Sequence, residues 1–336
     1  MNIFVTGGAG YIGSHTVLEL LGQGHDVVCA DNFSNSKPEA VDRIKKLAGR
    51  DFPFYDIDVR DGAALDKIFS SHEIDYIIHF AGFKAVGESV RNPLIYYENN
   101  VGSTIALCGA MQRHGVKKII FSSSATVYNS GNDMPLTEES PVGDCTNPYG
   151  RTKLMCEQIL SDAVAANGDW AVALLRYFNP IGAHSSGDIG EDPRDVPNNL
   201  MPYITQVAVG RLEHLNIFGD DYNTSDGTGV RDYIHVTDLA QGHVAAIWYI
   251  ENRTGTSVFN LGTGRGTSVL ELVEAFERAT GMKIKRKVAG RREGDLPVCF
   301  SSVVKAERLL YWTADKTIGE ACADAWRWQS KNPNGY

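Results

Sequence analysis

A glycine-rich loop that directly follows a short apolar run constrains the fold of this chain more than any other feature. Residues 2–6 form the apolar run, and Gly7, Gly10 and Gly13 follow with no spacer. Glycines at this spacing allow a tight turn, close approach of the backbone to a pyrophosphate and close packing of the next helix. We therefore predict a strand, a dinucleotide-binding loop and a helix in succession, and the alternative is an ordinary surface turn.

A second apolar run, residues 25–31, ends in an acidic residue. Asp31 is placed to bind the hydroxyls of the adenosine ribose. A carboxylate there would repel a 2′-phosphate, and no arginine stands within the next five residues to attract one. We therefore predict NAD rather than NADP as the cofactor.

Further downstream, a tyrosine and a lysine stand four residues apart, shortly after the serines at 122–124. On a helix, Tyr149 and Lys153 share one face, so the lysine lies one turn from the phenol. A phenol with a pKa of about 10 is a poor base at neutral pH unless a cation favours its phenolate. Alone, the pair would be interpreted as a solvated helix turn. Together with the glycine loop, it predicts redox chemistry on an alcohol.

Further apolar runs alternate with helical patterns and end in turns rich in Gly, Asn or Ser. They lie at residues 52–57, 76–80, 119–121 and 172–177. This alternation is typical of an α/β fold, a Rossmann-type doubly wound sheet with mostly parallel strands. Ligands bind such a sheet at the carboxyl ends of its strands. The candidate residues that follow these runs are Asp58, residues 80–84, residues 122–124 and residues 178–179.

The pattern changes after residue 180 to loops rich in Gly, Asp and Pro with scattered helical segments. We predict an NAD-binding domain at residues 1–180 and a smaller mixed α/β substrate domain at residues 181–336. A short strand near residues 256–262 is expected to rejoin the first sheet as an added edge. The helical pattern at 151–165 fits the core or half of a dimer interface, with the core as the default expectation.

Composition and charge limit the classes of function. The 336 residues are 43% hydrophobic and 22% charged, which suffices for a large core and two domains. A net charge of −9 without a basic stripe argues against nucleic-acid binding. No signal-peptide pattern opens the chain, so we expect a cytoplasmic protein without a membrane partner. The six cysteines form no C-x-x-C motif and no cluster with histidine, so we expect neither a disulfide framework nor a metal site.

These segments resemble the extended short-chain dehydrogenases/reductases that act on nucleotide sugars, and among them the UDP-hexose 4-epimerases. The resemblance covers nearly the whole chain. The matching segments are residues 5–13, 31–32, 79–82, 122–128, 147–153, 176–179, 231–236 and 290–295. In the last segment, the paired arginines at 291 and 292 are interpreted either as a solvated loop or as a clamp for a diphosphate.

The resemblance implies roles for three residues in the reaction. Tyr149, as phenolate, removes the proton of the sugar's 4-hydroxyl while hydride leaves carbon 4 for the nicotinamide of tightly bound NAD. Ser124 hydrogen-bonds the same oxygen, and Lys153 holds the nicotinamide ribose and lowers the pKa of Tyr149. The 4-keto sugar then turns over within the pocket, and hydride returns to its opposite face. Carbon 4 is inverted with no net redox change.

The resemblance also implies two sets of binding residues. Those that match the family's NAD contacts are Gly7, Gly10, Tyr11, Ile12, Gly13, Asp31, Asn32, Phe33, Asn35, Ser36, Asp58, Val59, Phe80, Ala81, Gly82, Lys84, Asn99, Ser122, Tyr149, Lys153 and Phe178. Those that match its UDP-sugar contacts are Lys84, Ser124, Tyr149, Tyr177, Asn179, Asn199, Leu200, Asn216, Ile217, Phe218, Arg231, Tyr233, Arg292, Asp295 and Cys299. The arginines are expected at the diphosphate and Asp295 at the uridine ribose. For Asn99 and Asn179, backbone capping in a turn is the alternative.

Two other functions fit parts of the pattern. Sugar 4,6-dehydratases resemble the segment 124–128 but carry an Asp-Glu pair where Ala125 and Thr126 stand, because eliminating water needs an acid and a base. A non-catalytic NAD-binding sensor can forgo the catalytic pair, whereas Ser124, Tyr149 and Lys153 are all present here. Both alternatives are therefore disfavoured.

The main departure from the family pattern is Cys299. Epimerases restricted to UDP-glucose and UDP-galactose carry a bulky tyrosine there, facing the sugar's 2-position, and versions that also accept N-acetylated sugars carry a small residue. The resemblance thus predicts an enzyme for both UDP-Glc/UDP-Gal and UDP-GlcNAc/UDP-GalNAc. The alternatives are a packing residue without consequence and an epimerase restricted to one sugar pair. A homodimer is expected by resemblance only.

Overall fold

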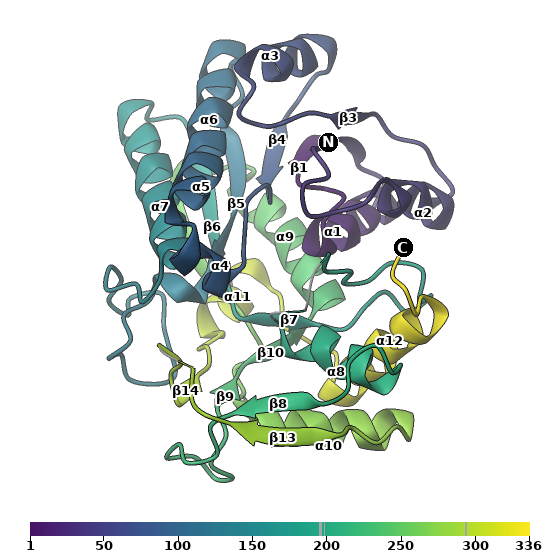
Figure 1. Cartoon of the computed structure of the whole chain (residues 1–336). Coiled ribbons are helices and arrows are strands. Elements are labelled where there is room, and N and C mark those ends of the chain that lie inside the picture. Colours follow the sequence, from purple (N-terminus) through teal and green to yellow (C-terminus); the bar gives the residue numbers. More distant parts are fainter. Residues whose placement is uncertain (195–196, 198, 293) are drawn as a thin grey trace.

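A seven-stranded parallel sheet organises the upper part of the molecule (Figure 1). The computed structural model describes residues 1–194, 197, 199–292 and 294–336. The strands are β1 (Asn2–Thr6), β2 (Asp26–Asp31), β3 (Phe54–Asp56), β4 (Tyr76–His79), β5 (Lys118–Ser124), β6 (Ala171–Tyr177) and β11 (Gly255–Leu261). They run in the order β11-β6-β5-β4-β1-β2-β3, and every neighbouring pair is parallel. The predicted Rossmann-type α/β fold is confirmed, and its strand order reverses between β1 and β4, where such sheets bind ligands.

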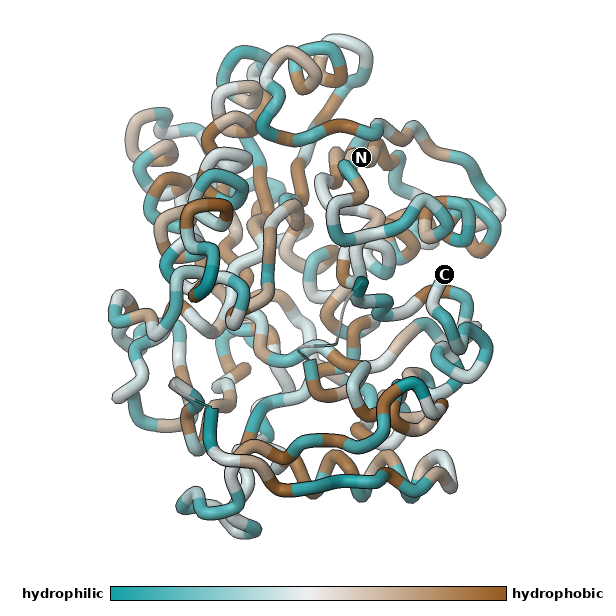
Figure 2. The backbone as a smooth tube through the Cα atoms, viewed as in Figure 1, coloured by the Kyte–Doolittle hydropathy of each residue, from teal (hydrophilic) through white to brown (hydrophobic). Residues whose placement is uncertain are grey.

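Helices cover both faces of this sheet, so its strands are buried on both sides. One face carries α1 (Tyr11–Gly22), α2 (Pro38–Ala48), α9 (Val236–Ile250) and α11 (Val304–Leu310), and the other carries α3 (Gly62–Ser71), α6 (Gly102–His114) and α7 (Pro148–Ala166). Alternate side chains of β1 enter the two cores, Ile3 and Val5 on one side and Phe4 on the other. Figure 2 shows the result as hydrophobic strands inside more hydrophilic outer helices.

Tyr149 and Lys153 lie on α7, which spans Pro148–Ala166. This helix begins three residues before the predicted start at residue 151. Asn147 caps it, since its side-chain oxygen accepts a hydrogen bond from the Gly150 N–H at 2.9 Å. Pro148 suits the first helical position, where no N–H is needed. Tyr149 therefore lies in the first turn. The serines at 122–124, which we expected after the fifth strand, are instead its last three residues.

The other elements form a smaller mixed α/β unit in the lower part of Figure 1. Its strands are β7 (Asn179–Ile181), β8 (Leu215–Phe218), β9 (Val230–Arg231), β10 (Tyr233–His235), β12 (Thr267–Ser268), β13 (Arg286–Ala289) and β14 (Val298–Cys299), and its helices are α8 (Leu200–Ala208), α10 (Val269–Thr280) and α12 (Ile318–Lys331). Met201, Ile217 and Phe276 belong to its core. Both α9 and β11 lie beyond residue 180 yet pack into the first sheet. The domain division at residue 180 stays a prediction.

Short helical pieces connect the larger elements. They are α4 (Val86–Arg91), α5 (Pro93–Tyr96), the π-helical turn η1 (Tyr97–Val101) and the 3₁₀ turn η2 (Ala125–Val127). Within the described ranges, no helix has the length and apolar character needed to cross a membrane. All six cysteines are free. Among the residues placed by the structure, no three His, Cys, Asp or Glu side chains are grouped to hold a metal ion.

Candidate active site

The glycine loop forms a cradle between β1 and α1. Gly7 has a φ of +73°, and a Cβ there would lie 2.7 Å from the backbone nitrogen of Ala81. A methyl group at Gly13 would overlap the carbonyl oxygen of Gly7. Helix α1 begins at Tyr11 with no side-chain cap and no acidic residue in its first turn, so its N–H groups are open to a phosphate. The cradle therefore fits the pyrophosphate of a dinucleotide.

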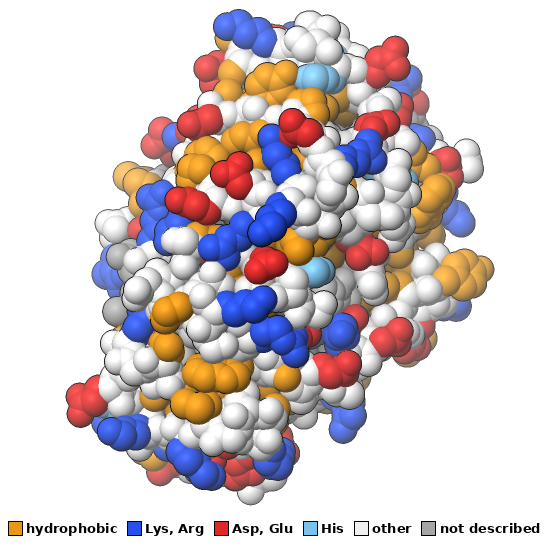
Figure 3. Space-filling view, turned by 90° about the vertical axis from the view of Figure 1, so that its right-hand side faces the viewer, with side chains coloured by type: hydrophobic (Ala, Val, Ile, Leu, Met, Phe, Trp, Pro, Cys, Tyr) orange, Lys and Arg blue, Asp and Glu red, His pale blue; other side chains and the backbone are white. Residues whose placement is uncertain are grey.

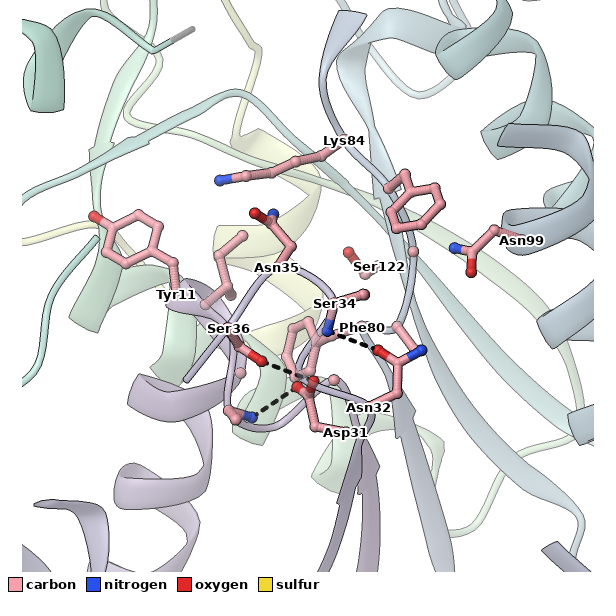
Figure 4. Close-up of a pocket in the computed structure, with 18 of the residues that line it drawn as sticks. Tyr11, Asp31, Asn32, Ser34, Asn35, Ser36, Phe80, Lys84, Asn99 and Ser122 are labelled. Atoms are coloured by element: carbon pink, nitrogen blue, oxygen red, sulfur yellow. Dashed lines mark hydrogen bonds between the residues drawn. The ribbon is translucent and has the colours of Figure 1, made fainter. Parts of the chain in front are cut away.

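Asp31 lies at the end of β2 in the same pocket (Figure 4). Its carboxylate accepts hydrogen bonds from the backbone N–H of Ala9 at 3.1 Å, the N–H of Phe33 at 2.9 Å and the hydroxyl of Ser36 at 2.8 Å. Burial raises the pKa of Asp31, and these bonds oppose the rise. The donors hold a carboxylate where a ribose diol can bind and a 2′-phosphate would be repelled, which fits NAD.

One pocket brings together all the residues predicted to contact NAD except Phe33 and Phe178. In Figure 4, Asp31 and Asn32 lie on one side of this pocket and Lys84 reaches over the other side. The ring of Phe33 instead stacks on Phe54, with ring centroids 5.2 Å apart. Phe178 is buried in an apolar cluster with Val127, Tyr128 and Leu136. Apolar packing thus holds both rings outside the pocket lining.

The pocket also contains residues that the sequence analysis missed. They are Ala9, Ser34, Lys37, Ile57, Ser103, Gly190, Glu191, Asp192, Pro193 and Tyr336. Several of them directly adjoin residues that were predicted to contact NAD. This adjacency in sequence could have identified them as pocket residues. The segment 190–193 and Tyr336 come from distant parts of the chain, and no local motif marks them.

Tyr149 and Lys153 line the pocket beside Ser122. The Lys153 ammonium donates a hydrogen bond to the Ser122 carbonyl oxygen at 2.6 Å and lies 6.0 Å from the centre of the Tyr149 ring. Burial lowers the pKa of Lys153 to about 8. Burial also raises the pKa of Tyr149 to about 12, and a hydrogen bond with Ser124 opposes the rise. Burial therefore sets the net direction of the shift, and the lowering of the Tyr149 pKa by Lys153 stays a prediction.

Tyr177, at the end of β6, lines the same pocket, and its hydroxyl is hydrogen-bonded to His243. Nδ1 of His243 lies 2.8 Å from the Leu239 carbonyl oxygen, so this nitrogen carries the proton. Nε2 is then an acceptor, and the Tyr177 hydroxyl donates to it at 2.5 Å. Burial lowers the pKa of His243 to about 4, so the ring is neutral at pH 7. The ring of Phe80 packs on the same histidine, with centroids 4.8 Å apart.

The predicted diphosphate and uridine residues form a separate group outside this pocket. The Arg292 guanidinium donates to Asp295 at 3.0 Å, and the Arg231 guanidinium lies 3.9 Å from the same carboxylate. Arg292 also lies 4.7 Å from the centre of the Phe218 ring. Cys299 on β14 pairs in register with Arg231 on β9. The structure thus brings five predicted substrate residues together.

The other predicted substrate residues are more dispersed. Asn199 and Lys84 both donate hydrogen bonds to Glu191, at 2.7 and 2.9 Å. Tyr233 and Ile217 are buried in the core of the smaller unit, which keeps their side chains from open space. The remaining predicted positions are Ser124 at the end of β5, Asn179 at the start of β7, Leu200 at the start of α8 and Asn216 on β8. Of the arginine segment 290–295, Glu293 lies outside the described residues.

A dinucleotide cradle, a ribose-binding carboxylate and a Tyr-Lys pair in one pocket define a Rossmann-type enzyme that acts on an alcohol. The model of the NAD dependent epimerase/dehydratase family matches residues 3–262. This chain belongs to that family. NAD is therefore its cofactor, and the glycine cradle and Asp31 are the groups that would hold it.

Known proteins are similar to the chain over its whole length. The UDP-glucose 4-epimerase of Bacillus subtilis (strain 168) is 59% identical, over 100% of this chain and 99% of that protein. The crystal structure of UDP-glucose 4-epimerase from Bifidobacterium longum in complex with NAD+ and UDP superposes with a TM-score of 0.97, at 53% identity over 100% of both chains. The UDP-Glc/GlcNAc 4-epimerase from Campylobacter jejuni superposes with a TM-score of 0.85, at 38% identity over 98% of this chain and 99% of that chain.

Proposed function

We propose that the protein is an NAD-dependent UDP-glucose 4-epimerase that works through a transient 4-keto sugar and also accepts UDP-GlcNAc and UDP-GalNAc. The observation that carries the proposal is that Tyr149 and Lys153 line the same pocket as the glycine cradle. The full-length similarity to the Bacillus subtilis enzyme supports UDP-glucose and UDP-galactose as substrates. The Campylobacter jejuni relative supports the wider sugar range.

The proposed reaction needs a base that serves both faces of one carbon. NAD, when bound, supplies a positively charged ring that accepts hydride from carbon 4 and returns it. Tyr149 takes the proton of the 4-hydroxyl and gives it back, and Ser124 hydrogen-bonds the same oxygen. Because the pKa of Tyr149 is about 12, its phenolate needs a nearby positive charge at pH 7. Lys153, with a pKa of about 8, is protonated at that pH and supplies one such charge.

The 4-keto sugar must turn over before the hydride returns, so the UDP rather than the hexose has to be held firmly. Arg231 and Arg292 are the groups proposed to bind the diphosphate. Both face the Asp295 carboxylate, and Arg292 is half exposed, so a diphosphate can compete for its donors. Guanidinium groups bind phosphates in a bidentate, oriented manner, which suits this anchoring role.

Cys299 is the residue proposed to admit N-acetylated sugars. Its side chain is partly buried and packs against the apolar cluster that contains Phe178. Burial raises the pKa of the thiol, so the residue is small and neutral at pH 7. A tyrosine at this position would fill space that a 2-N-acetyl group needs.

A homodimer is part of the proposal because one face of the molecule leaves apolar side chains in solvent. Val90 on α4, Leu94 on α5, Ile105 on α6 and Met155 on α7 are all exposed, and these helices adjoin one another. A second copy of the chain could cover them. Sedimentation velocity that found only a 36.8-kDa species would contradict this part of the proposal.

The central test offers the purified protein each of the two UDP-sugar pairs and measures both equilibration rates. Tyr149→Phe should keep NAD bound but reduce turnover by about 10²–10⁴-fold, because the base is lost and the ring remains. Tyr311→Phe is a matched control, since Tyr311 is 92% exposed and far from any proposed role. Near-normal turnover by Tyr149→Phe would refute the assignment of the base. No turnover of either sugar pair by the unaltered protein would refute the proposed function.

A further inference from the structure

The NAD pocket has an outer wall that comes from two segments far from the glycine loop in sequence. We call this wall the strap and define it as residues 190–193 together with Tyr336. All of its residues line the pocket. Figure 1 marks the end of the chain beside α12 and below α2, which is where the strap lies. Figure 3 shows this side of the molecule, which carries both basic and acidic side chains.

Two side-chain ion pairs tie the strap to the cofactor-binding half, Lys84–Glu191 at 2.9 Å and Lys37–Asp192 on the ribose-binding side. The Asp192 carboxylate lies 2.6 Å from the Lys37 ammonium and accepts a hydrogen bond from the backbone N–H of Tyr336 at 3.0 Å. The Asp192 side chain is 7% exposed and that of Lys37 is 33% exposed. Lys37 directly precedes α2, close to the Ser36 that binds Asp31, and it also lines the pocket. The Lys37–Asp192 bridge therefore spans the pocket between its ribose-binding side and the strap.

Other contacts hold the strap against α12 and α2. The Trp328 indole N–H donates to the Glu191 carbonyl oxygen at 3.1 Å, and the ring of Tyr336 packs on Trp328 with centroids 4.6 Å apart. The Arg43 guanidinium of α2 lies 4.9 Å from the centre of the Tyr336 ring. These contacts hold the strap on the α12 side, and the Lys37–Asp192 bridge adds a direct link to the ribose-binding segment.

We propose that the strap retains NAD, and that opening of the Lys37–Asp192 ion pair limits the rate at which NAD leaves. A dinucleotide in the cradle would lie between Asp31 and the strap, so its departure requires Lys37 and Asp192 to separate. Separation leaves a mostly buried carboxylate without its cation, which is costly. Retention matters because a hydride that is removed must be returned by the same cofactor. The proposal depends on NAD binding and not on which sugar the enzyme converts.

The test is the rate at which the full-length protein, purified with NAD bound, loses NAD after dilution into NAD-free buffer. Lys37→Met keeps the aliphatic stem and removes the charge, and it should speed the loss by about tenfold or more. Asp192→Asn should have a similar effect. The double variant should lose NAD no faster than the faster single variant, because one ion pair is removed in every case.

Lys45→Met is the matched control. Lys45 lies on α2, its ammonium is also 2.6 Å from a carboxylate, that of Asp51, and its side chain is also 33% exposed, but neither partner lines the pocket. NAD loss from this variant should equal that from the unaltered protein. An unchanged rate of NAD loss from Lys37→Met would overturn the proposal. A double variant whose increase in rate equals the product of the two single increases would overturn it as well. If Asp192→Asn fails to fold, Lys37→Met alone decides, because its side chain is more exposed.

Discussion

At the scale of single residues, Cys299 is where one side chain is expected to set the range of substrates. Cys299→Tyr should reduce turnover of UDP-GlcNAc and UDP-GalNAc by about 10²-fold or more and leave that of UDP-glucose and UDP-galactose within a few-fold, because added bulk excludes only the larger sugars. The measurement is the initial rate on each sugar pair. Cys299→Ser, which stays small, should retain both activities. Equal loss of both activities in Cys299→Tyr would indicate a general disturbance at Arg231, which pairs with Cys299 in the sheet. It would contradict the proposal that the size of residue 299 selects the sugars.

The residues that could be predicted from sequence are those whose role depends on local geometry. Gly7 and Gly13 are required by close backbone contacts in one turn, and Asp31 follows its strand directly. The pKa of Tyr149 could not be predicted in the same way. Its rise to about 12 comes from protein that surrounds the ring, and the position of Lys153 on the same helix face does not reveal that burial.

At the scale of elements, the start of α7 is the feature on which the active site most depends. Asn147→Ala removes the cap of the Gly150 N–H and should lower the free energy of unfolding by about 1 kcal/mol. It should also lower turnover, because Tyr149 lies in the first turn of α7, which loses its cap in this variant. Urea unfolding and initial rates measure the two effects.

The control for the cap is Asp61→Ala. Asp61 caps α3 by accepting hydrogen bonds from Ala63 and Ala64, so its loss should cost a similar amount of stability. Asp61 is not in the pocket, and turnover should be unchanged. A loss of turnover of the same size in both variants would mean that general destabilisation, and not the placement of Tyr149, limits the rate.

Element types were predictable from apolar periodicity, but their ends were less so. The helix starts at Pro148 rather than at 151 because a capping asparagine and a proline extend it toward the N-terminus, beyond its apolar pattern. The serines at 122–124 continue β5 although they are polar, because backbone pairing with β6 runs as far as Ser124 and Tyr177. Backbone hydrogen bonds set these ends, and side-chain hydropathy does not report them.

At the scale of the whole molecule, the features that the sequence did not predict are contacts between segments that are far apart in the chain. Helix α9 covers the sheet beside α1, and the strap closes the NAD pocket from residues 190–193 and Tyr336. Helix α9 is more than a hundred residues from α1, and Asp192 is more than a hundred residues from Lys37, and no motif marks either contact. Such pairings depend on the packing of complete layers, which a single sequence does not reveal.

Burial of histidines by the whole fold predicts how stability depends on pH. Burial lowers the pKa of His15 and of His79 to about 3 and that of His243 to about 4, whereas unfolded histidine titrates near 6.5. Below pH 6.5 the unfolded chain therefore binds more protons than the folded chain, and the free energy of unfolding falls as the pH falls. Three such groups should lower it by roughly 3–4 kcal/mol between pH 7 and pH 5.5.

On the alkaline side, Lys153 predicts a second window in which stability rises with pH. Its folded pKa of about 8 lies below the unfolded value of 10.5, so the unfolded chain keeps a proton that the folded chain releases. The free energy of unfolding should therefore rise as the pH increases from 8 towards 10.5, as far as this group is concerned. Lys153→Met should remove that rise and leave most of the acid-side fall. Burial is the larger cause of the low pKa of His79, and the charge of Lys153 is the smaller one. Urea titrations at pH 5.5, 7, 8 and 9.5 separate the two trends, and a curve that is flat from pH 7 to 5.5 would contradict the burial of neutral histidines.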